Sequence, residues 1–489
     1  MHRRGTLAAT EITIRRGAET ILERVSLAVT PSSRIGVVGP NGRGKTTLLR
    51  ALAGLEPLDG GRVTRAPATL RVGYLPQERD VDPAETVGEY LARRSGEPPG
   101  WRAGRALAEA GADVPFDRPL GSLSGGEAAR AALASILVAQ FDVYLLDEPT
   151  NDLDFAGLDL LERFVHSLDA GVVVVSHDRA FLDRTVTRIV ELEAGTQRVH
   201  EYPGGWSEYE AARDRARAEH ERAYAEWERE RRRVTDLHRE RREQARTGGR
   251  QAYRRGTHAL MSKTRAAAKR LERLDRDRVE KPWQPWELRL SLSPAARGGD
   301  LVVALEGAVI ERGGFRLGPL DLHVGWGERI SIFGPNGSGK STLLGAVLGR
   351  LALAAGERRA GPGALLGEIG QRRELFDARC PLIDSFRTAA DLPEGEARTV
   401  LAKFDLYADH VTRPAGTLSP GERTRAELAV LAAHGVNCLV LDEPTNHLDL
   451  PAIEELERAL AAYEGTLLLV THDRRFLERV GVTRSIALS

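Results

Sequence analysis

Two nine-residue runs, GPNGRGKTT at 39–47 and GPNGSGKST at 334–342, constrain this chain more than any other feature. Both fit the pattern G-x-x-x-x-G-K-[ST], a glycine-rich loop whose backbone N–H groups surround a phosphate. Lys45 and Lys340 are 295 positions apart. The pairs LSGGE and LSPGE, LLDEPTN and VLDEPTN, and SHD and THD repeat that offset. Four motif pairs in one order and one register predict a duplicated ATP-binding domain.

Composition narrows the class of protein. The chain carries 70 Lys and Arg against 70 Asp and Glu among 489 residues. A net charge of zero attracts no nucleic acid over the whole surface, so any such attraction needs a local patch. The N-terminus has no apolar signal-peptide core, and runs such as 171–175 and 467–470 are too short to cross a bilayer. We expect a soluble, cytoplasmic protein without direct membrane insertion.

The chain divides into three segments by pattern. We place the first α/β domain at 6–204, a charged linker at 205–287 and the second domain at 288–489. Each domain begins with a strand-rich lead that shows β-branched alternation broken by Gly. Each then continues as an apolar strand, a glycine loop and a helix, which is the context that a phosphate loop requires.

The linker predicts an antiparallel helical hairpin. It contains no Pro between 206 and 281, and a capping box at 207–210 favours a helix start. Gly248, Gly249 and Gly256 mark the turn. A first arm of about 40 residues would extend roughly 60 Å at 1.5 Å per residue.

The tip of this hairpin carries charge of one sign. No acidic residue occurs from 244 to 271, whereas the flanking helices mix both signs. A solvated charged surface is the common reading of a charge run, but a purely basic turn with an aromatic residue suits phosphate backbones and stacked bases. The candidates for nucleic-acid contact are Arg246, Arg250, Tyr253, Arg254, Arg255, His258, Lys263 and Arg265.

The two glycine loops supply most of the nucleotide-binding candidates. Lys45 and Lys340 would contact the β- and γ-phosphates of ATP, and Thr46 and Ser341 would offer a hydroxyl to Mg²⁺. The full ATP-binding candidates are Gly39, Pro40, Asn41, Gly42, Arg43, Gly44, Lys45, Thr46 and Thr47, and Gly334, Pro335, Asn336, Gly337, Ser338, Gly339, Lys340, Ser341 and Thr342.

Two adjacent carboxylates follow an apolar strand in each domain. Asp147 and Asp442, at the strand ends, would hold Mg²⁺ directly or through water. Glu148 and Glu443 would face the γ-phosphate and polarise the attacking water. Their position after a buried strand, at a fixed distance from a phosphate loop, favours this role over that of solvated turn residues.

Two further residue types complete each predicted site. His177 and His472 end the next buried strand and would touch the γ-phosphate or the water. A lone His after a strand is usually structural, but its repetition 295 positions later favours catalysis. Gln77 and Gln371 are candidate ligands of Mg²⁺ or water, one position out of that register.

A second helix start in each domain offers phosphate-binding groups. Ser124, Gly125, Gly126 and Glu127 form a capping box with free N–H groups, and Ser419, Gly421 and Glu422 form its second copy. Each domain's own loop already serves its phosphate, whereas phosphoryl transfer needs donors around the γ-phosphate. The sequence therefore predicts head-to-tail domains, in which each capping box closes over the ATP of the other.

These motifs resemble ATP-binding cassette proteins, and the paired cassettes with a charged helical linker resemble the ABC-F subfamily. DEPTN-x-LD in both copies and YPGGWSEYE before the linker carry this resemblance across essentially the whole chain. It implies P-loop NTPase domains, each with an antiparallel β lead and a helical subdomain, joined by the hairpin. It also implies that residues of the Lys45 site work with Ser419, Gly421 and Glu422, and those of the Lys340 site with Ser124, Gly125 and Gly126.

The resemblance further implies a ribosomal role. Members of the family bind the ribosome near its tRNA exit site, with the linker directed toward the peptidyl-transferase centre. The expected partners are rRNA and tRNA at the linker tip, and two cassettes in one chain make an obligate oligomer unnecessary. We expect antibiotic resistance by ribosome protection; the alternatives are a housekeeping translation factor, the ATPase subunit of a membrane exporter, and a DNA-repair ATPase.

One departure from the family pattern concerns the second capping box. LSPGE has Pro420 where the family often has Gly. Pro is tolerated at the first helical position but brings no N–H donor. The site on Lys45 therefore loses one phosphate hydrogen bond, and we expect that site to be the slower of the two.

Overall fold

The computed structural model describes residues 5–76, 82–96, 100–123, 125–138, 140–151, 153–193, 198–247, 257–279, 300–370, 375–446 and 448–488. The chain forms two compact units, Met1–Trp206 with Trp286–Ser489 and, separately, Ser207–Pro285. The first unit holds both cassettes, and the second unit is the linker. The exact domain bounds given above stay predictions.

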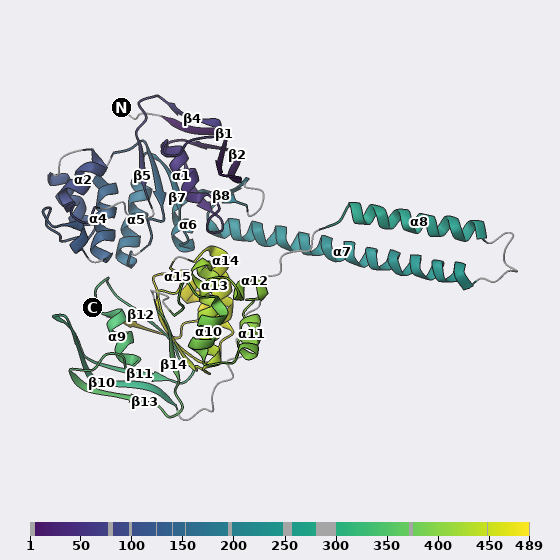
Figure 1. Cartoon of the computed structure of the whole chain (residues 1–489). Coiled ribbons are helices and arrows are strands. Elements are labelled where there is room, and N and C mark those ends of the chain that lie inside the picture. Colours follow the sequence, from purple (N-terminus) through teal and green to yellow (C-terminus); the bar gives the residue numbers. More distant parts are fainter. Residues whose placement is uncertain are drawn as a thin grey trace. The chain divides into compact units, whose positions relative to one another are not determined.

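The first cassette contains two sheets. Its strands are β1 (Thr6–Arg16), β2 (Glu19–Val29), β3 (Arg34–Val38), β4 (Gly60–Ala66), β5 (Val72–Leu75), β6 (Val143–Asp147), β7 (Gly171–Val175), β8 (Arg188–Leu192) and β9 (Val199–Pro203). The large sheet has the order β5-β6-β7-β3-β8-β9 and is parallel except for β9. Strands β2-β1-β4 form a separate antiparallel sheet, labelled in Figure 1. The predicted β lead is confirmed.

The large sheet brings the motif residues to one edge. Every residue of β6 and β7 is buried, as expected for parallel strands covered on both faces. The carboxyl ends of parallel strands meet at the same side of the sheet, where ligands of such folds bind. The loop after β3, the carboxylates that end β6 and the histidine after β7 therefore come together.

Helices cover this sheet and form a subdomain of their own. They are α1 (Lys45–Ala53), α2 (Val87–Ser95), α3 (Trp101–Glu109), α4 (Gly125–Val138), α5 (Phe155–Ser167) and α6 (Arg179–Thr185), with a 3-10 turn at Leu120–Ser122. Helices α2 and α3 pack against α4 around a core that includes Val87, Leu91 and Leu107. This group is the predicted helical subdomain.

The second cassette repeats the architecture. Its strands are β10 (Leu301–Arg312), β11 (Phe315–Gly325), β12 (Arg329–Phe333), β13 (Ala355–Ala360), β14 (Leu366–Ile369), β15 (Cys438–Asp442), β16 (Thr466–Val470) and β17 (Arg484–Ala487). The parallel sheet has the order β14-β15-β16-β12-β17, and the antiparallel sheet is β11-β10-β13. Its helices are α9 (Lys340–Val347), α10 (Leu382–Ala390), α11 (Glu394–Lys403), α12 (Ala408–Val411), α13 (Pro420–Ala433), α14 (Leu450–Ala461) and α15 (Arg474–Val480).

The linker is an antiparallel helical hairpin of α7 (Trp206–Thr247) and α8 (Thr257–Arg276), drawn side by side in Figure 1. The indole N–H of Trp227 donates to the carbonyl of Leu274 at 2.8 Å, and Val234 and Ala267 are buried. The predicted hairpin is therefore confirmed.

The linker tip is only partly described. Arg265 is exposed on α8. Arg250, Tyr253, Arg254 and Arg255, and the side chains of Arg246, His258 and Lys263, lie outside the described residues. Within the described ranges, every helix is too short or too polar to cross a lipid bilayer.

Candidate active site

Each glycine loop turns tightly into the helix that follows it. Helix α1 begins at Lys45 after Gly44, whose φ is 89°, and α9 begins at Lys340 after Gly339, whose φ is 92°. Residues other than glycine rarely adopt this left-handed backbone conformation. A Cβ on Gly44 would also lie 2.9 Å from Cγ2 of Ile21. The glycines therefore allow the tight turn from each loop into its helix.

The loop lysines are held by their own loops. The Nζ of Lys45 donates to the carbonyls of Gly39 at 2.7 Å and Pro40 at 3.1 Å, and to Oδ1 of Asn41 at 3.3 Å. The Nζ of Lys340 donates to the corresponding carbonyls at 2.8 and 3.1 Å. Burial lowers the pKa of both ammonium groups, while nearby carboxylates, Glu148 and Glu443 first, oppose that shift.

The strand-end aspartates each bond to the hydroxyl after the loop lysine. Asp147 bonds to Thr46, and Asp442 bonds to Ser341. Burial raises the pKa of Asp147 to about 6 and also raises the pKa of Asp442. The hydroxyl of Tyr74 donates to Oδ2 of Asp147 at 3.3 Å.

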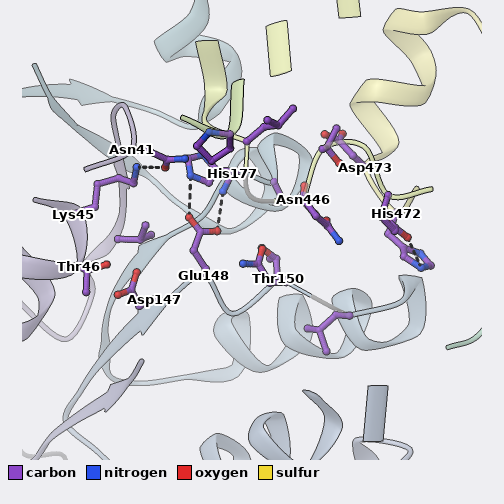
Figure 2. Close-up of a pocket in the computed structure, with 18 of the residues that line it drawn as sticks. Asn41, Lys45, Thr46, Asp147, Glu148, Thr150, His177, Asn446, His472 and Asp473 are labelled. Atoms are coloured by element: carbon purple, nitrogen blue, oxygen red, sulfur yellow. Dashed lines mark hydrogen bonds and ion pairs between the residues drawn. The ribbon is translucent and has the colours of Figure 1, made fainter. Parts of the chain in front are cut away.

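The glutamates and histidines form pairs. The main-chain N–H of His177 donates to Oε2 of Glu148 at 3.3 Å. Nε2 of the same histidine lies 3.2 Å from Oε1 of Glu148 (Figure 2). In the second cassette, Nε2 of His472 lies 3.4 Å from Oε1 of Glu443. Burial lowers the pKa of His177 to about 3 and that of His472 to about 4, so both imidazoles are neutral near pH 7.

Glu148 and Glu443 share an uncommon backbone conformation. Both have a φ of 49°, a left-handed value that costs energy for residues other than glycine. The N–H of Glu148 donates to the carbonyl of Val175 at 2.9 Å, and the N–H of Glu443 donates to the carbonyl of Val470 at 2.8 Å. These two bonds hold each turn against the neighbouring strand. Such strain persists where the surrounding structure holds it, often at functional sites.

The two cassettes exchange contacts at these loops. The N–H of Asn41 donates to Oδ2 of Asp449 at 3.1 Å, and the N–H of Asn336 donates to Oδ2 of Asp154, also at 3.1 Å. Each aspartate also caps a helix of its own cassette, α14 and α5 respectively. A Cβ on Gly126 would lie only 2.7 Å from Cβ of Asn336. This arrangement is head-to-tail.

A cavity of about 800 Å³ lies between these elements and is lined by both cassettes (Figure 2). Of the predicted site residues, it is lined by Asn41, Gly42, Gly44, Lys45, Thr46, Thr47, Gly126, Glu127, Asp147, Glu148, His177, Asn336, Gly337, Glu443 and His472.

Other predicted site residues lie away from this cavity. Lys340, Ser341 and Asp442 do not line it. The hydroxyl of Ser419 accepts the N–H of Glu422 at 3.2 Å, which completes the predicted capping box. Ser124, Gln77 and Gln371 lie outside the described residues.

Sequence reasoning missed three kinds of residue at the site. Asp154 and Asp449 also lie 295 positions apart, and this repetition could have revealed them. Tyr74 was harder to predict, because the tyrosine is not repeated in the second copy. The corresponding residue there is Glu368, which forms an ion pair with Arg350. The third kind is a set of ion pairs between the cassettes, described below.

Asp178, which follows His177, provides a test by pH. Burial, then the carboxylates of Asp473 and Glu162, raises the pKa of Asp178 to about 7. The unfolded chain loses this proton near pH 4, whereas the folded chain keeps it to about pH 7, so the free energy of unfolding falls as pH rises between them. Asp178 caps α6, and Asn caps equally well.

Asp178→Asn is therefore expected to raise the unfolding temperature of its cassette at pH 7.5 by about 2–4 °C, as ~1 kcal/mol gives in a domain of roughly 150–250 residues. It should also flatten the pH dependence between 4 and 7. Calorimetry measures both, with Asp236→Asn on the exposed face of α7 as the control. An unchanged pH slope would contradict the assignment.

The fold and the site define an ATP-binding cassette ATPase. The family model described as ABC transporter matches residues 22–151 and again 317–446. The chain belongs to the ABC-F family. It is 32% identical to ABC transporter F family member 5 of Arabidopsis thaliana, across 94% of this chain and 72% of that protein.

Two bacterial relatives and one solved structure extend the comparison. The tylosin resistance ATP-binding protein TlrC of Streptomyces fradiae is 36% identical, over 96% of this chain and 94% of the relative. The energy-dependent translational throttle protein EttA of Escherichia coli K12 is 31% identical, over 94% and 88%. One chain in the crystal structure of the complex of archaeal ribosomal stalk protein aP1 and archaeal ribosome recycling factor aABCE1 shares the fold, with a TM-score of 0.65 and 21% identity. The match covers 98% of this chain and 87% of that chain.

Proposed function

We propose that this ATPase acts on the ribosome in the cytoplasm, uses two composite ATP sites to bring its cassettes together, and confers antibiotic resistance by ribosome protection. The reciprocal contacts of Asn41 with Asp449 and of Asn336 with Asp154 carry the proposal. Each phosphate loop meets a residue of the other cassette, so a nucleotide held by one loop lies beside both cassettes. Binding of ATP would thereby be converted into a change in the linker's position.

The side chains divide the chemistry at each site. Lys45 would contact the β- and γ-phosphates, and Glu148 would polarise the attacking water. His177, neutral and 3.2 Å from Glu148, would orient that carboxylate. At the other site Lys340 and Glu443 would take the corresponding roles, and His472 would orient Glu443.

The residues also fit Mg²⁺, with Thr46 and Asp147 at one site and Ser341 and Asp442 at the other. Oδ1 of Asp147 is buried and has no hydrogen-bond partner among the described residues, which suits a cation ligand. No group of three or more His, Cys, Asp or Glu in the described ranges could hold a metal ion alone. Protein sites for Mg²⁺ typically combine one or two carboxylates with substrate phosphates. When bound, Mg²⁺ neutralises charge on the phosphates.

The ribosomal part of the proposal draws on the relatives and the linker. One relative is named for resistance to tylosin and another for throttling translation. The linker forms an extended hairpin, and Arg265 near its tip is exposed. We propose that the basic tip contacts rRNA, and tRNA where present, near the peptidyl-transferase region.

Sedimentation with ribosomes tests this role. The Glu148→Gln/Glu443→Gln double variant with ATP is expected to sediment with ribosomes, because bound ATP that is not hydrolysed keeps the cassettes together. The same protein with ADP, and wild type with ATP, should remain mostly free. A double variant that stays free with ATP would count heavily against the ribosomal role.

A housekeeping translation factor is the second candidate, favoured by the similarity to EttA. The two roles separate in a translation assay that contains tylosin. Resistance predicts that added protein restores synthesis in the presence of the drug, whereas the housekeeping role predicts the same effect on synthesis with and without the drug.

A further inference from the structure

A buried ion pair joins the two cassettes directly behind one histidine. Arg179, two residues after His177, begins α6 and is 1% exposed. Its Nη1 donates to Oε2 of Glu457 on α14 of the second cassette at 3.0 Å, and its Nη2 contacts Oε1. Oδ2 of Asp473 lies 3.5 Å from the same Nη2. The guanidinium of Arg179 therefore forms a bidentate ion pair with Glu457 across the interface between the cassettes.

Duplication places the same residue types on the opposite side, with a different outcome. Arg474 and Glu162 each lie 295 positions from Arg179 and Glu457. Their closest atoms are 3.8 Å apart. Arg474 instead bonds to Asp159 at 2.8 Å and lies over the ring of Phe155, and its side chain is 29% exposed. Arg179 is thus fully buried, whereas Arg474 is only partly buried.

Because Arg179 and Glu457 are buried, their ion pair is stable only when the two cassettes are docked. A charge removed from water is tolerated only with a well-aligned partner, and loss of that partner leaves an uncompensated buried charge. Glu457 belongs to the other cassette, so Arg179 finds this partner only when the cassettes are docked. The bond of Arg474 to Asp159 is only partly buried, so water screens it in part and it contributes less.

The enclosed pair is connected to one ATP site by a short rigid path. The main-chain N–H of His177 holds Glu148, and Asp178 caps α6 through the N–H of Phe181 at 2.9 Å. Arg179 is the next residue on that helix. Fixing Arg179 against Glu457 therefore fixes the backbone that positions His177 beside Glu148.

We propose that Arg179 and Glu457 form an interface latch, in which Arg179 is a positioning residue that couples cassette docking to the placement of His177 and Glu148 at the Lys45 site. The Arg474–Glu162 pair has no equivalent effect on the Lys340 site. The inference rests on the proposed ATP chemistry but not on the ribosomal role.

Isolated wild-type protein, without ribosomes, provides the baseline ATP turnover. If the wild type shows no turnover, the proposed ATP chemistry is wrong, and this result would not bear on the latch. Arg179→Met is tested in two backgrounds. In Glu443→Gln, where the Lys45 site alone turns over, we expect kcat to fall at least tenfold with KM for ATP within about twofold, because the loop that binds ATP is intact. In Glu148→Gln, where the Lys340 site alone turns over, the fall should stay below threefold.

Two controls separate positioning from loss of structure. Arg474→Met should lower turnover less than threefold in either background, and Arg179→Glu/Glu457→Arg should recover part of the activity that each single exchange removes. Circular dichroism and binding of a fluorescent ATP analogue verify that each variant folds. An equal loss in both backgrounds, or an equal loss in Arg474→Met, would overturn the latch.

Discussion

Glu443→Gln is expected to reduce total ATP turnover more than Glu148→Gln does, and the double variant is expected to fall by about 10²- to 10⁴-fold, the range that general-base catalysis contributes. Gln keeps the size of the side chain and a hydrogen-bonding oxygen but cannot accept the proton of the attacking water. The loss should therefore appear in kcat, with ATP binding retained.

The inequality follows from Pro420. It occupies the first helical position of α13 and lines the cavity that Lys45 also lines. A proline has no N–H to offer a phosphate, whereas the corresponding Gly125 in the first cassette has one. The Lys45 site should be the slower site, so Glu148→Gln removes the smaller share of the turnover. Steady-state hydrolysis of both single variants measures this, and equal losses would argue against unequal sites.

Gly126→Ala is expected to lower ATP turnover at least tenfold. The new methyl group would lie 2.7 Å from Cβ and 3.2 Å from Nδ2 of Asn336, across the interface between the cassettes. Real Cβ contacts are not that short, so the second phosphate loop must shift away. That shift would break the bond from the N–H of Asn336 to Asp154. Helical backbone accepts Ala readily at this position, so the effect comes from the interface.

Gly421→Ala is the matched control. A Cβ at Gly421 would meet Cβ of Ala452 at 3.0 Å, within the same cassette. We expect a smaller loss of turnover, below about threefold, because a contact of that length needs only a few tenths of an ångström of adjustment. Hydrolysis assays and unfolding temperatures of both variants decide the comparison. Equal losses, or a lowered unfolding temperature in Gly126→Ala alone, would indicate local damage instead of a blocked interface.

The local chemistry of each cassette was predictable because each motif is a short run with its own strand, loop or helix start. Lys45 opens a helix after a glycine loop, and Asp147 and Glu148 end a buried strand, as the patterns indicated. The repeat at 295 positions then predicted a second copy of each motif and of the strand or helix that carries it. The paired helices of the linker followed in the same way from the lack of Pro, the capping box and the turn glycines.

A duplicated ATP-binding cassette with a helical hairpin between the copies could be predicted from the order of the residues, because strand, loop and cap preferences act over a few residues. Which residues meet between the copies became known only from the packing of the folded domains. Asn41 and Asp449 are 408 positions apart, and Arg179 and Glu457 are 278 apart. The packing of the domains also buries one of two equivalent arginines fully and the other only in part. Burial depends on how whole domains dock, and two matching motifs acquire different energies when the surfaces around them differ.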